Sequence, residues 1–469
     1  MKYLSKAIVS VAAAAALSVA LPAGAGGQSR VPEPGSPATR PIQPLPEIMR
    51  PTVERFLRSV CAVPTSAGTM HNNSVTVAET WTEAGSPYSL PYDINVSAPL
   101  TIEPCAVVRI AAGKTITIKP GGAFIAAGQD RRPVTIERVT GGMAWTQIRA
   151  LGGDLSLTHA VVSGGGASAS APALVALAAA LHVQSGSLHV DDVEIVDSQS
   201  QGVLLDGTGG FDASSQNLRI RGAAGFPLNV FARFVGSIPS GQYTGNGRDA
   251  IGIAGAAAGG ALLFSQTMRN HGVPYHVGTG QNGGRLDVSS QSNGAVAVLT
   301  VDPGVTIQFP PAGMLFVAGR NATNGPALGA LIANGAGAPI VFTSDQNAAL
   351  VPGGWIGIRI GDPVDPRTVL QNVKVMFAGA ADSAGSNSCP YPGFSTINDA
   401  AIRILGVPST QFITNSEIIA SARMGIDRGW RSDIQPDFLP SNAFTAVASC
   451  KQTTPRMTSG ACPINPPCP

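Results

Sequence analysis

Charged side chains are scarce in this chain of 469 residues. Asp, Glu, Lys and Arg make up 12% of it, about half the ~25% that is usual for globular proteins. Lys and Arg number 30 and Asp and Glu 28, which gives a formal net charge of +2, and no block of basic residues occurs. Nucleic-acid binding depends on such blocks. We therefore expect no nucleic-acid partner.

Long apolar runs are missing beyond the N-terminus. Residues 1–25 have the pattern of a secretory signal: Lys2 and Lys6, an apolar segment, and the small-residue cleavage site 23–25. The later Ala-rich run, 171–183, contains Pro172 and is too short to cross a bilayer. We expect a mature chain without a membrane span that is secreted, extracellular or held at the cell surface.

Several catalytic sequence patterns are also missing. The chain has no G-x-S-x-G, no H-E-x-x-H, no phosphate-binding loop and no dinucleotide fingerprint. These absences argue against the common hydrolases, zinc proteases and nucleotide enzymes. We expect no cofactor.

Six cysteines are present, and they suit an oxidising compartment, where structural disulfides persist. Cys61 and Cys105 form a plausible pair, because Cys105 follows a proline at the position that Gly304 holds in the second copy of the repeat described below. A cluster near the C-terminus should tie down the tail. The candidates for disulfides are Cys61, Cys105, Cys389, Cys450, Cys462 and Cys468. No metal site is expected, because no C-x2-C pair completes four zinc ligands.

The chain contains a long internal repeat. The frame T-x4-G-x-P-Y occurs at 80–88 and again at 267–275. Further segments recur in the same order: 100–104 at 299–303, 122–128 at 329–335, 145–149 at 355–359, and 193–195 at 416–418. Order and spacing survive while loops vary, so the repeat is architectural.

Short strand-like runs such as Thr115–Ile118 recur along both copies, with Gly or Pro in most gaps. Strands this short cannot hold a core alone, but stacked coils bury one another's faces. One coil of roughly 20–25 residues would hold three strands. A sandwich array, the alternative, would need tight hairpins. Asn324-Gly325 and Asp206-Gly207 do not lie between alternating runs.

Four phrases carry a family resemblance: 299–309, 337–344, Gly353-Gly354-Trp355-x-Gly357-Ile358, and Tyr243-Thr244-Gly245-Asn246. With them the chain resembles secreted bacterial right-handed parallel β-helix repeat proteins of the pectin-lyase-like class, over about residues 75–450. The resemblance and the repeat together predict an all-β fold, a right-handed parallel β-helix built from two tandem divergent copies. The resemblance implies little about activity, because this fold hosts lyases, hydrolases, adhesins and stalks.

The domain organisation follows from these patterns. We expect a signal peptide at 1–25, a Pro-rich spacer with a short helix at 26–60, and a Pro- and Cys-rich tail at 451–469. The first β-helix module is predicted at 61–262 and the second at 263–450.

One polar cluster is a weak catalytic candidate: Asp191, Asp192 and Glu194, with Arg219 and Arg221 about one coil later. His182, His189 and Asp197 lie nearby. Stacked on one face, these side chains would suit acid–base chemistry or Ca²⁺ binding. The alternative interpretation is an ordinary strand edge with ion pairs between coils. The second copy has Asn415 and Ala420 at the places of Asp192 and Asp197, so such a site would be confined to one half.

The repeated aromatic residues are interpreted first as packing residues. Trp145 and Trp355 should fill a coil corner, and a sugar-stacking platform is the alternative that makes them weak ligand-binding candidates. Tyr88 and Tyr275 should pack at the entry to a coil. His159 aligns with Asn372, which indicates a ladder of polar turn residues.

Without an evident catalytic constellation, the leading hypothesis is a non-enzymatic secreted or cell-surface scaffold, adhesin-like, that binds a glycan or a protein. Its partner would be a polysaccharide or a cell-surface protein. The alternative is a polysaccharide lyase or glycoside hydrolase acting on an acidic polysaccharide at the 182–221 cluster, with Ca²⁺ as a possible cofactor in that case alone.

Overall fold

The computed structural model describes residues 59–168, 178–255, 260–279, 284–291, 295–319, 328–345, 350–381, 399–430, 434–455 and Cys468. These residues belong to one compact unit, 51–469. The predicted signal peptide, almost all of the spacer with its short helix, and most of the C-terminal tail lie outside the described residues. Within the described part, no helix combines the length and the apolar character needed to cross a bilayer.

The elements of the first half are nearly all short strands. They are β1 (Thr69–Met70), β2 (Glu79–Trp81), η2 (Glu83–Gly85), β3 (Tyr88–Leu90), β4 (Ile94–Val96), β5 (Pro99–Ile102), β6 (Val107–Ile110), β7 (Thr115–Ile118), β8 (Ala123–Ala127), β9 (Val134–Arg138), β10 (Gln147–Leu151), β11 (Asp154–Ser163), β12 (Ala179–Ser185), β13 (Ser187–Val196), β14 (Gln201–Leu205), β15 (Gly210–Phe211), β16 (Gln216–Arg221), β17 (Leu228–Val230), η4 (Ala232–Ser237), β18 (Gly241–Gln242) and β19 (Ile251–Ala254).

The second half continues in the same way. Its strands are β20 (Ala261–Leu263), β21 (Gln266–Met268), β22 (Tyr275–Thr279), β23 (Arg285–Ser290), β24 (Val296–Val301), β25 (Thr306–Phe309), β26 (Met314–Val317), β27 (Leu328–Asn334), β28 (Ile340–Ser344), β29 (Gly357–Ile360), β30 (Val369–Gln371), β31 (Val373–Met376), β32 (Ala400–Ile404), β33 (Ile413–Thr414), β34 (Glu417–Ile419), β35 (Met424–Arg428) and β36 (Ala443–Thr445).

The strands alternate between core and outside. In β7, Ile116 and Ile118 are buried while Thr115 and Thr117 are half-buried on the outer side. This period of two follows from strand geometry, because successive side chains point to opposite faces. One continuous apolar core therefore runs through both halves.

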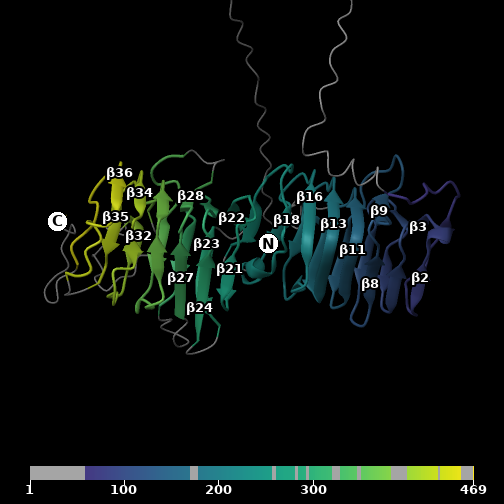
Figure 1. Cartoon of the computed structure of the whole chain (residues 1–469), viewed down its shortest axis with the longest axis horizontal. Coiled ribbons are helices and arrows are strands. Elements are labelled where there is room, and N and C mark those ends of the chain that lie inside the picture. The colour runs from purple at the N-terminus through teal and green to yellow at the C-terminus, as the bar shows by residue number, and fades with distance from the viewer. Residues whose placement is uncertain are drawn as a thin grey trace, which may run out of the picture. The chain divides into compact units, whose positions relative to one another are not determined.

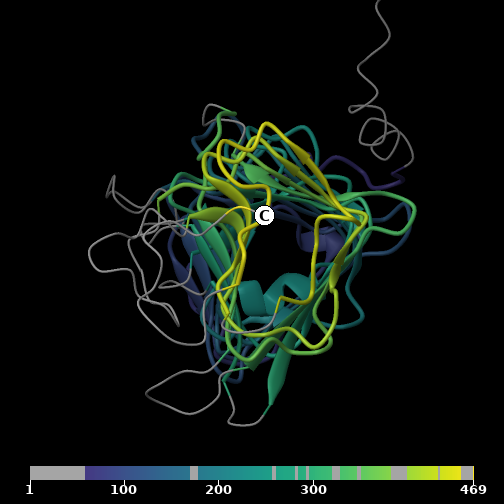
Figure 2. The same ribbon diagram turned by 90° about the vertical axis from the view of Figure 1, so that its left-hand side faces the viewer.

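Each strand pairs with strands one coil earlier and one coil later, as β7 does with β4 and β10. The chain thus winds through three short strands per coil, and Figure 1 shows successive coils in chain order. Figure 2, turned by 90°, shows the strands of these coils lying over one another. Every pairing between named strands in the described part is parallel, which rules out the sandwich array. The predicted all-β parallel β-helix is confirmed.

In the part of the chain that the structure describes, the strands form four sheets, of 12, 13, 6 and 5 strands. The 13-stranded sheet runs from β4 to β36 and passes through both copies of the repeat without a break. The 12-stranded sheet is confined to the first copy, and it includes long strands such as β11 and β13 that bend from one face of the coil to the next.

The two copies are joined with an offset of one strand position around the coil. The repeat equates β5, β6 and β7 with β24, β25 and β26. In the first copy, the 13-stranded sheet contains the third strand of each coil, such as β7. In the second copy, it contains the second strand of each coil, such as β25. The switch occurs where β19 pairs with β22, with Ile251 opposite Tyr275. Faces that are equivalent by sequence therefore belong to different sheets.

Local geometry matches between the copies despite this offset. The backbone is left-handed at His159 and at its counterpart Asn372, with φ of 45° and 51°. It is left-handed again at Asp192 and Asn415, with φ of 57° and 50°. Asn and Asp tolerate this conformation better than most residues. The aligned polar residues thus mark bends between strands.

Candidate functional site

The polar cluster at 182–221 is distributed over three faces of the coil. His189 and Asp191 point outward from the first part of β13, before the bend at Asp192. Beyond the bend, Val193 and Ile195 enter the core, so Glu194 points outward from the next face. His182 belongs to β12, which lies in the other long sheet. Glu194, Arg219 and Arg221 lie together on one face, with Asp192 at the bend in contact with Arg219. The other members of the cluster lie on different faces.

The candidate carboxylates contact basic or amide side chains of the neighbouring coils. Asp192 Oδ1 lies 3.3 Å from an Nη of Arg219, and its Oδ2 lies 2.8 Å from His159 Nδ1. Glu194 accepts a hydrogen bond from Arg221 Nε at 2.9 Å. Asp191 accepts one from the Gln216 amide at 3.1 Å. These contacts are those of cross-coil pairing, the alternative interpretation of this cluster.

The remaining members of the cluster have separate partners. His182 Nε2 lies 3.0 Å from Asp206, and His189 lies 3.1 Å from the Ser214 hydroxyl. Ser214 also donates to Asp212 from its backbone N–H and its hydroxyl, and these hydrogen bonds lower the pKa of that carboxyl. Asp197 is an exposed residue in a left-handed turn.

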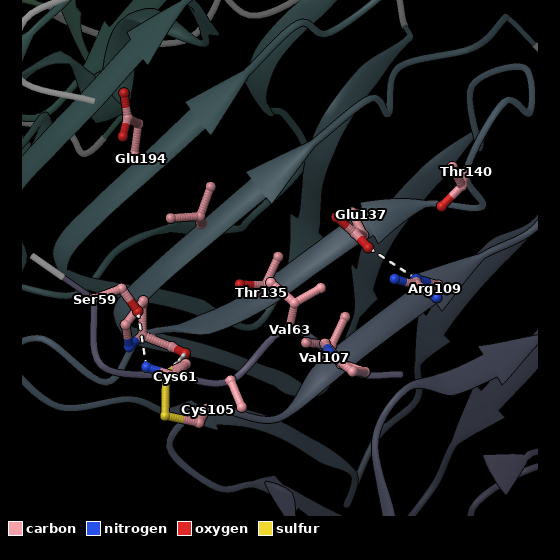
Figure 3. A pocket seen from close by; sticks show the side chains of 14 residues that line it. Ser59, Cys61, Val63, Cys105, Val107, Arg109, Thr135, Glu137, Thr140 and Glu194 are labelled. Carbon is pink, nitrogen blue, oxygen red and sulfur yellow. Dashed lines mark hydrogen bonds and ion pairs between the residues drawn. A yellow bond between two sulfur atoms is a disulfide. The ribbon is translucent and has the colours of Figure 1, made fainter. Parts of the chain in front are cut away.

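A cavity of about 360 Å³ lies beside Glu194 (Figure 3). Its floor is the outward side of β6, β9, β11 and β13, and the lead-in segment 61–64 contributes to its lining. Glu194 is 2% exposed, while Arg109 and Glu137 pair across the floor at 2.9 Å. The lead-in segment is held to this face by the Cys61–Cys105 disulfide.

Two disulfides are present in the described part of the chain. The predicted Cys61–Cys105 bridge forms, and Cys105 has a φ of 67° where the second copy has Gly304 at 78°. Cys450 bonds to Cys468 and ties the tail to the last coil. Cys389 and Cys462 lie outside the described residues.

Trp145 and Trp355 are core residues, each 0% exposed. Their indole N–H groups donate to the backbone carbonyls of Ser163 and Met376, at 2.9 and 2.8 Å. Neither ring presents a face to solvent, so neither can serve as the sugar platform that was the alternative. Tyr88 and Tyr275 are likewise buried, as their packing interpretation predicts.

A larger open groove of about 730 Å³ lies where the two copies meet. Three stretches of chain line it: residues 211–215, the segment 233–240 with η4, and residues 264–269. Val298 and Thr300 of β24 extend it. This "junction groove" coincides with the change of sheet between the copies, where η4 contacts β15, β20 and β21.

The junction groove contains two arginines and no carboxylate among its lining residues. An Nη of Arg233 donates to the Gly207 carbonyl, and an Nη of Arg269 donates to the Gly236 carbonyl. The Arg233 guanidinium also lies 5.1 and 5.2 Å from the ring centroids of Phe231 and Phe234. Within the described part of the chain, neither arginine forms an ion pair.

Hydroxyl, amide and aromatic groups complete the junction groove. Gln266 accepts a hydrogen bond from the Gly236 N–H through its Oε1, which orients the side-chain amide. Thr267 of β21 lies opposite Thr300 of β24. Phe264 is 52% exposed between β20 and β21. Aromatic surface beside a few fixed polar groups is typical of small-molecule and sugar sites.

A second polar cluster joins distant parts of the chain around the 13-stranded sheet. Arg248 donates to Asp345 at 2.7 Å and to His276 Nδ1 at 2.8 Å. Burial, followed by the nearby Arg248 charge, lowers the pKa of His276 to about 4. A neutral imidazole can accept through Nδ1, so the contact with Arg248 and the lowered pKa agree.

Sequence reasoning missed both the junction groove and the Arg248 cluster. Their residues are widely spaced and match no motif, and the groove depends on how the copies are joined. Among the described residues, no group of three or more His, Cys, Asp or Glu is placed to hold a metal ion.

Comparisons with protein-family models, with curated proteins and with solved structures find no match to this chain.

Proposed function

We propose that this chain is an exported β-helical scaffold that binds a polysaccharide in the junction groove without cleaving it. The observation that carries the proposal is the groove itself. It is open, about 730 Å³ in volume, and lined by hydroxyls, an amide and an exposed aromatic ring.

Export is supported by two independent features. The N-terminus has the pattern of a secretory signal. Two disulfides fasten the two ends of the described chain, and such bonds persist in oxidising compartments.

Binding without cleavage is supported by the directions in which the carboxylates of the 182–221 cluster point and by their burial. An acid–base pair must reach the same glycosidic bond. Asp191 and Glu194 point from different faces of the coil. Glu194 is also 2% exposed and accepts a hydrogen bond from Arg221.

The test uses the purified mature chain against a panel of neutral and acidic polysaccharides, scoring binding and depolymerisation together. Thr300→Met should obstruct the groove without changing its charge and weaken binding at least tenfold. Thr101→Met is the matched control, because Thr101 holds the equivalent place on β5 outside the groove. Phe264→Ala should weaken binding, whereas Val77→Ala, at the equivalent exposed position, should not.

Three results would overturn the proposal. The first is equal binding by the Thr300→Met and Thr101→Met variants. The second is binding of a cell-surface protein and no polysaccharide. The third is depolymerisation that disappears in Asp192→Ala, which would favour a lyase or hydrolase at the 182–221 cluster.

A further inference from the structure

We infer that the junction groove selects acidic polysaccharides, through contacts of Arg233 and Arg269 with a carboxylate or sulfate group on the sugar. This inference rests on the proposed function and specifies its ligand. It depends on the charges that line the groove and on what already occupies the two guanidinium groups.

The groove carries unbalanced positive charge. Its lining includes two guanidinium groups and no carboxylate. Elsewhere in the described chain, arginines on strand faces commonly meet acids, as Arg109 meets Glu137, Arg219 meets Asp192 and Arg221 meets Glu194. An anionic ligand would supply the missing partner.

Both guanidinium groups are held in place without using all of their donors. Each arginine has five N–H donors in a planar fork. One Nη of each bonds to a backbone carbonyl, of Gly207 for Arg233 and of Gly236 for Arg269. A carbonyl orients the group but leaves its positive charge uncompensated, which suits recognition of an anion.

Arg233 is the more strongly fixed of the two. Its guanidinium lies over two phenylalanine rings. Its Nε is buried and has no hydrogen-bond partner among the described residues, and an unsatisfied buried donor is costly. Arg269 is exposed. Arg233 would therefore bind one acidic group of the polymer in a fixed position. The exposed side chain of Arg269 would adjust its position to the next acidic group.

The ligand class follows from these groups together. Phe264 and the threonines offer contacts that any sugar can use, whereas the arginines discriminate by charge. Neutral glycans should therefore bind weakly, and polymers with an acidic group on successive residues should bind best.

The test measures binding of the full mature chain to three probes: polygalacturonate, the same polymer after reduction of its carboxyl groups, and dextran sulfate. Arg269→Gln should weaken binding of an acidic probe about tenfold, the order expected for one charge-assisted hydrogen bond. Its binding of the carboxyl-reduced polymer should not change. Arg132→Gln is the control, since it removes the same charge from an exposed site outside the groove.

Because Arg233→Gln could disturb folding around η4, Arg233→Lys is the second variant. It keeps the charge but loses the planar fork, and we expect an intermediate loss of affinity. Comparison of the two acidic probes shows whether carboxylate or sulfate is preferred.

The outcomes separate the two proposals. If no polysaccharide binds, the proposed function fails. If the reduced and acidic polymers bind equally in the groove, or if Arg269→Gln and Arg132→Gln lose affinity equally, the function stands and the selectivity for acids is wrong.

Discussion

Glu194 is an acid on the outward side of a strand that has nevertheless become buried. It is 2% exposed, it lines the cavity that the lead-in segment borders, and Arg221 neutralises its charge through a hydrogen bond of 2.9 Å. An exposed carboxylate at a strand position would need no such partner. The hydrogen bond between Glu194 and Arg221 is therefore explained by the need to pair a buried carboxylate.

The Glu194–Arg221 pair predicts a difference between two similar substitutions. Glu194→Gln should destabilise the protein by about 2–3 kcal/mol, because it removes a hydrogen bond between two charged groups where the carboxylate is buried. Glu137→Gln, which breaks the more exposed pair with Arg109, should cost less than about 1 kcal/mol. Urea unfolding of both variants measures this difference. Equal losses would contradict the assignment of Glu194 to packing.

His276 predicts a loss of stability in mild acid. Its pKa falls from 6.5 to about 4 on folding, so between these values the unfolded chain binds the extra proton. The stability that neutral His276 contributes is complete above pH 6.5 and is lost as the pH falls towards 4. Asp399 acts in the opposite direction, because burial raises its pKa to about 6.

The measurement is the midpoint of thermal unfolding between pH 7 and 4 for the wild type and His276→Gln. Glutamine cannot take up the proton but can still accept from Arg248. The variant should lose less stability over this range, by about 2 kcal/mol. His271, whose pKa burial also lowers to about 4, stays in both proteins as a common background. Parallel curves would show that His276 is not a source of acid sensitivity.

The bends between strands are the elements that fix which face a side chain occupies. Many of them contain one residue with a positive φ, and the same position recurs in both copies with different amino acids. Gly113 has a φ of 70° before β7, while its counterpart before β26 is Ala312, with a φ of 61°. Alanine is strained in this conformation and glycine is not.

These two positions predict that exchanging glycine and alanine changes the stability of the protein in opposite directions. Gly113→Ala should destabilise by about 1 kcal/mol, because a Cβ there meets no atom within 4 Å and only the backbone strain remains. Ala312→Gly should stabilise by several tenths of a kcal/mol, since relief of strain exceeds the added chain entropy. Thermal or urea unfolding measures both effects. Destabilisation by Ala312→Gly would argue against a strained bend.

The strands could be predicted from the sequence, but the faces of the 182–221 cluster could not. Alternation in Thr115–Ile118 specifies which side chains enter the core. Between Asp191 and Glu194 the same alternation is interrupted by the left-handed residue Asp192. This bend moves the acids to different faces, and its position is not visible from hydropathy, because an Asp is common both in turns and on exposed strands.

At the scale of the whole molecule, the repeat predicted the stacking of coils and the two copies. It could not predict the offset between the copies. The sequence pattern within each copy is the same whichever strands of the other copy it pairs with. The junction groove follows from that offset, so it was not predictable either. The Cys61–Cys105 bridge was predictable, because the repeat marks Cys105 as a departure from Gly304.

The uninterrupted 13-stranded sheet predicts that the two copies unfold together. Its pairing continues through the junction from β19 to β22, so each copy is stabilised by contact with the next coil. Trp81 and Trp145 report on the first copy, and Trp355 and Trp430 on the second. In two variants, both tryptophans of one copy are replaced with phenylalanine, so that fluorescence follows the other copy. Their urea midpoints, read with hydrogen exchange of each half, should coincide after correction for the substitutions. Two separated transitions would show a weak junction.

The offset also bears on how the halves diverged. Because corresponding residues of the two copies face different neighbours and different directions, a substitution that suits one half has no reason to suit the other. Selection would then have acted on each half separately, which explains why Asp192 corresponds to Asn415 and Asp197 to Ala420. A molecule assembled from two divergent copies in this way has, where they meet, a groove that is built from residues of both and that neither copy forms alone.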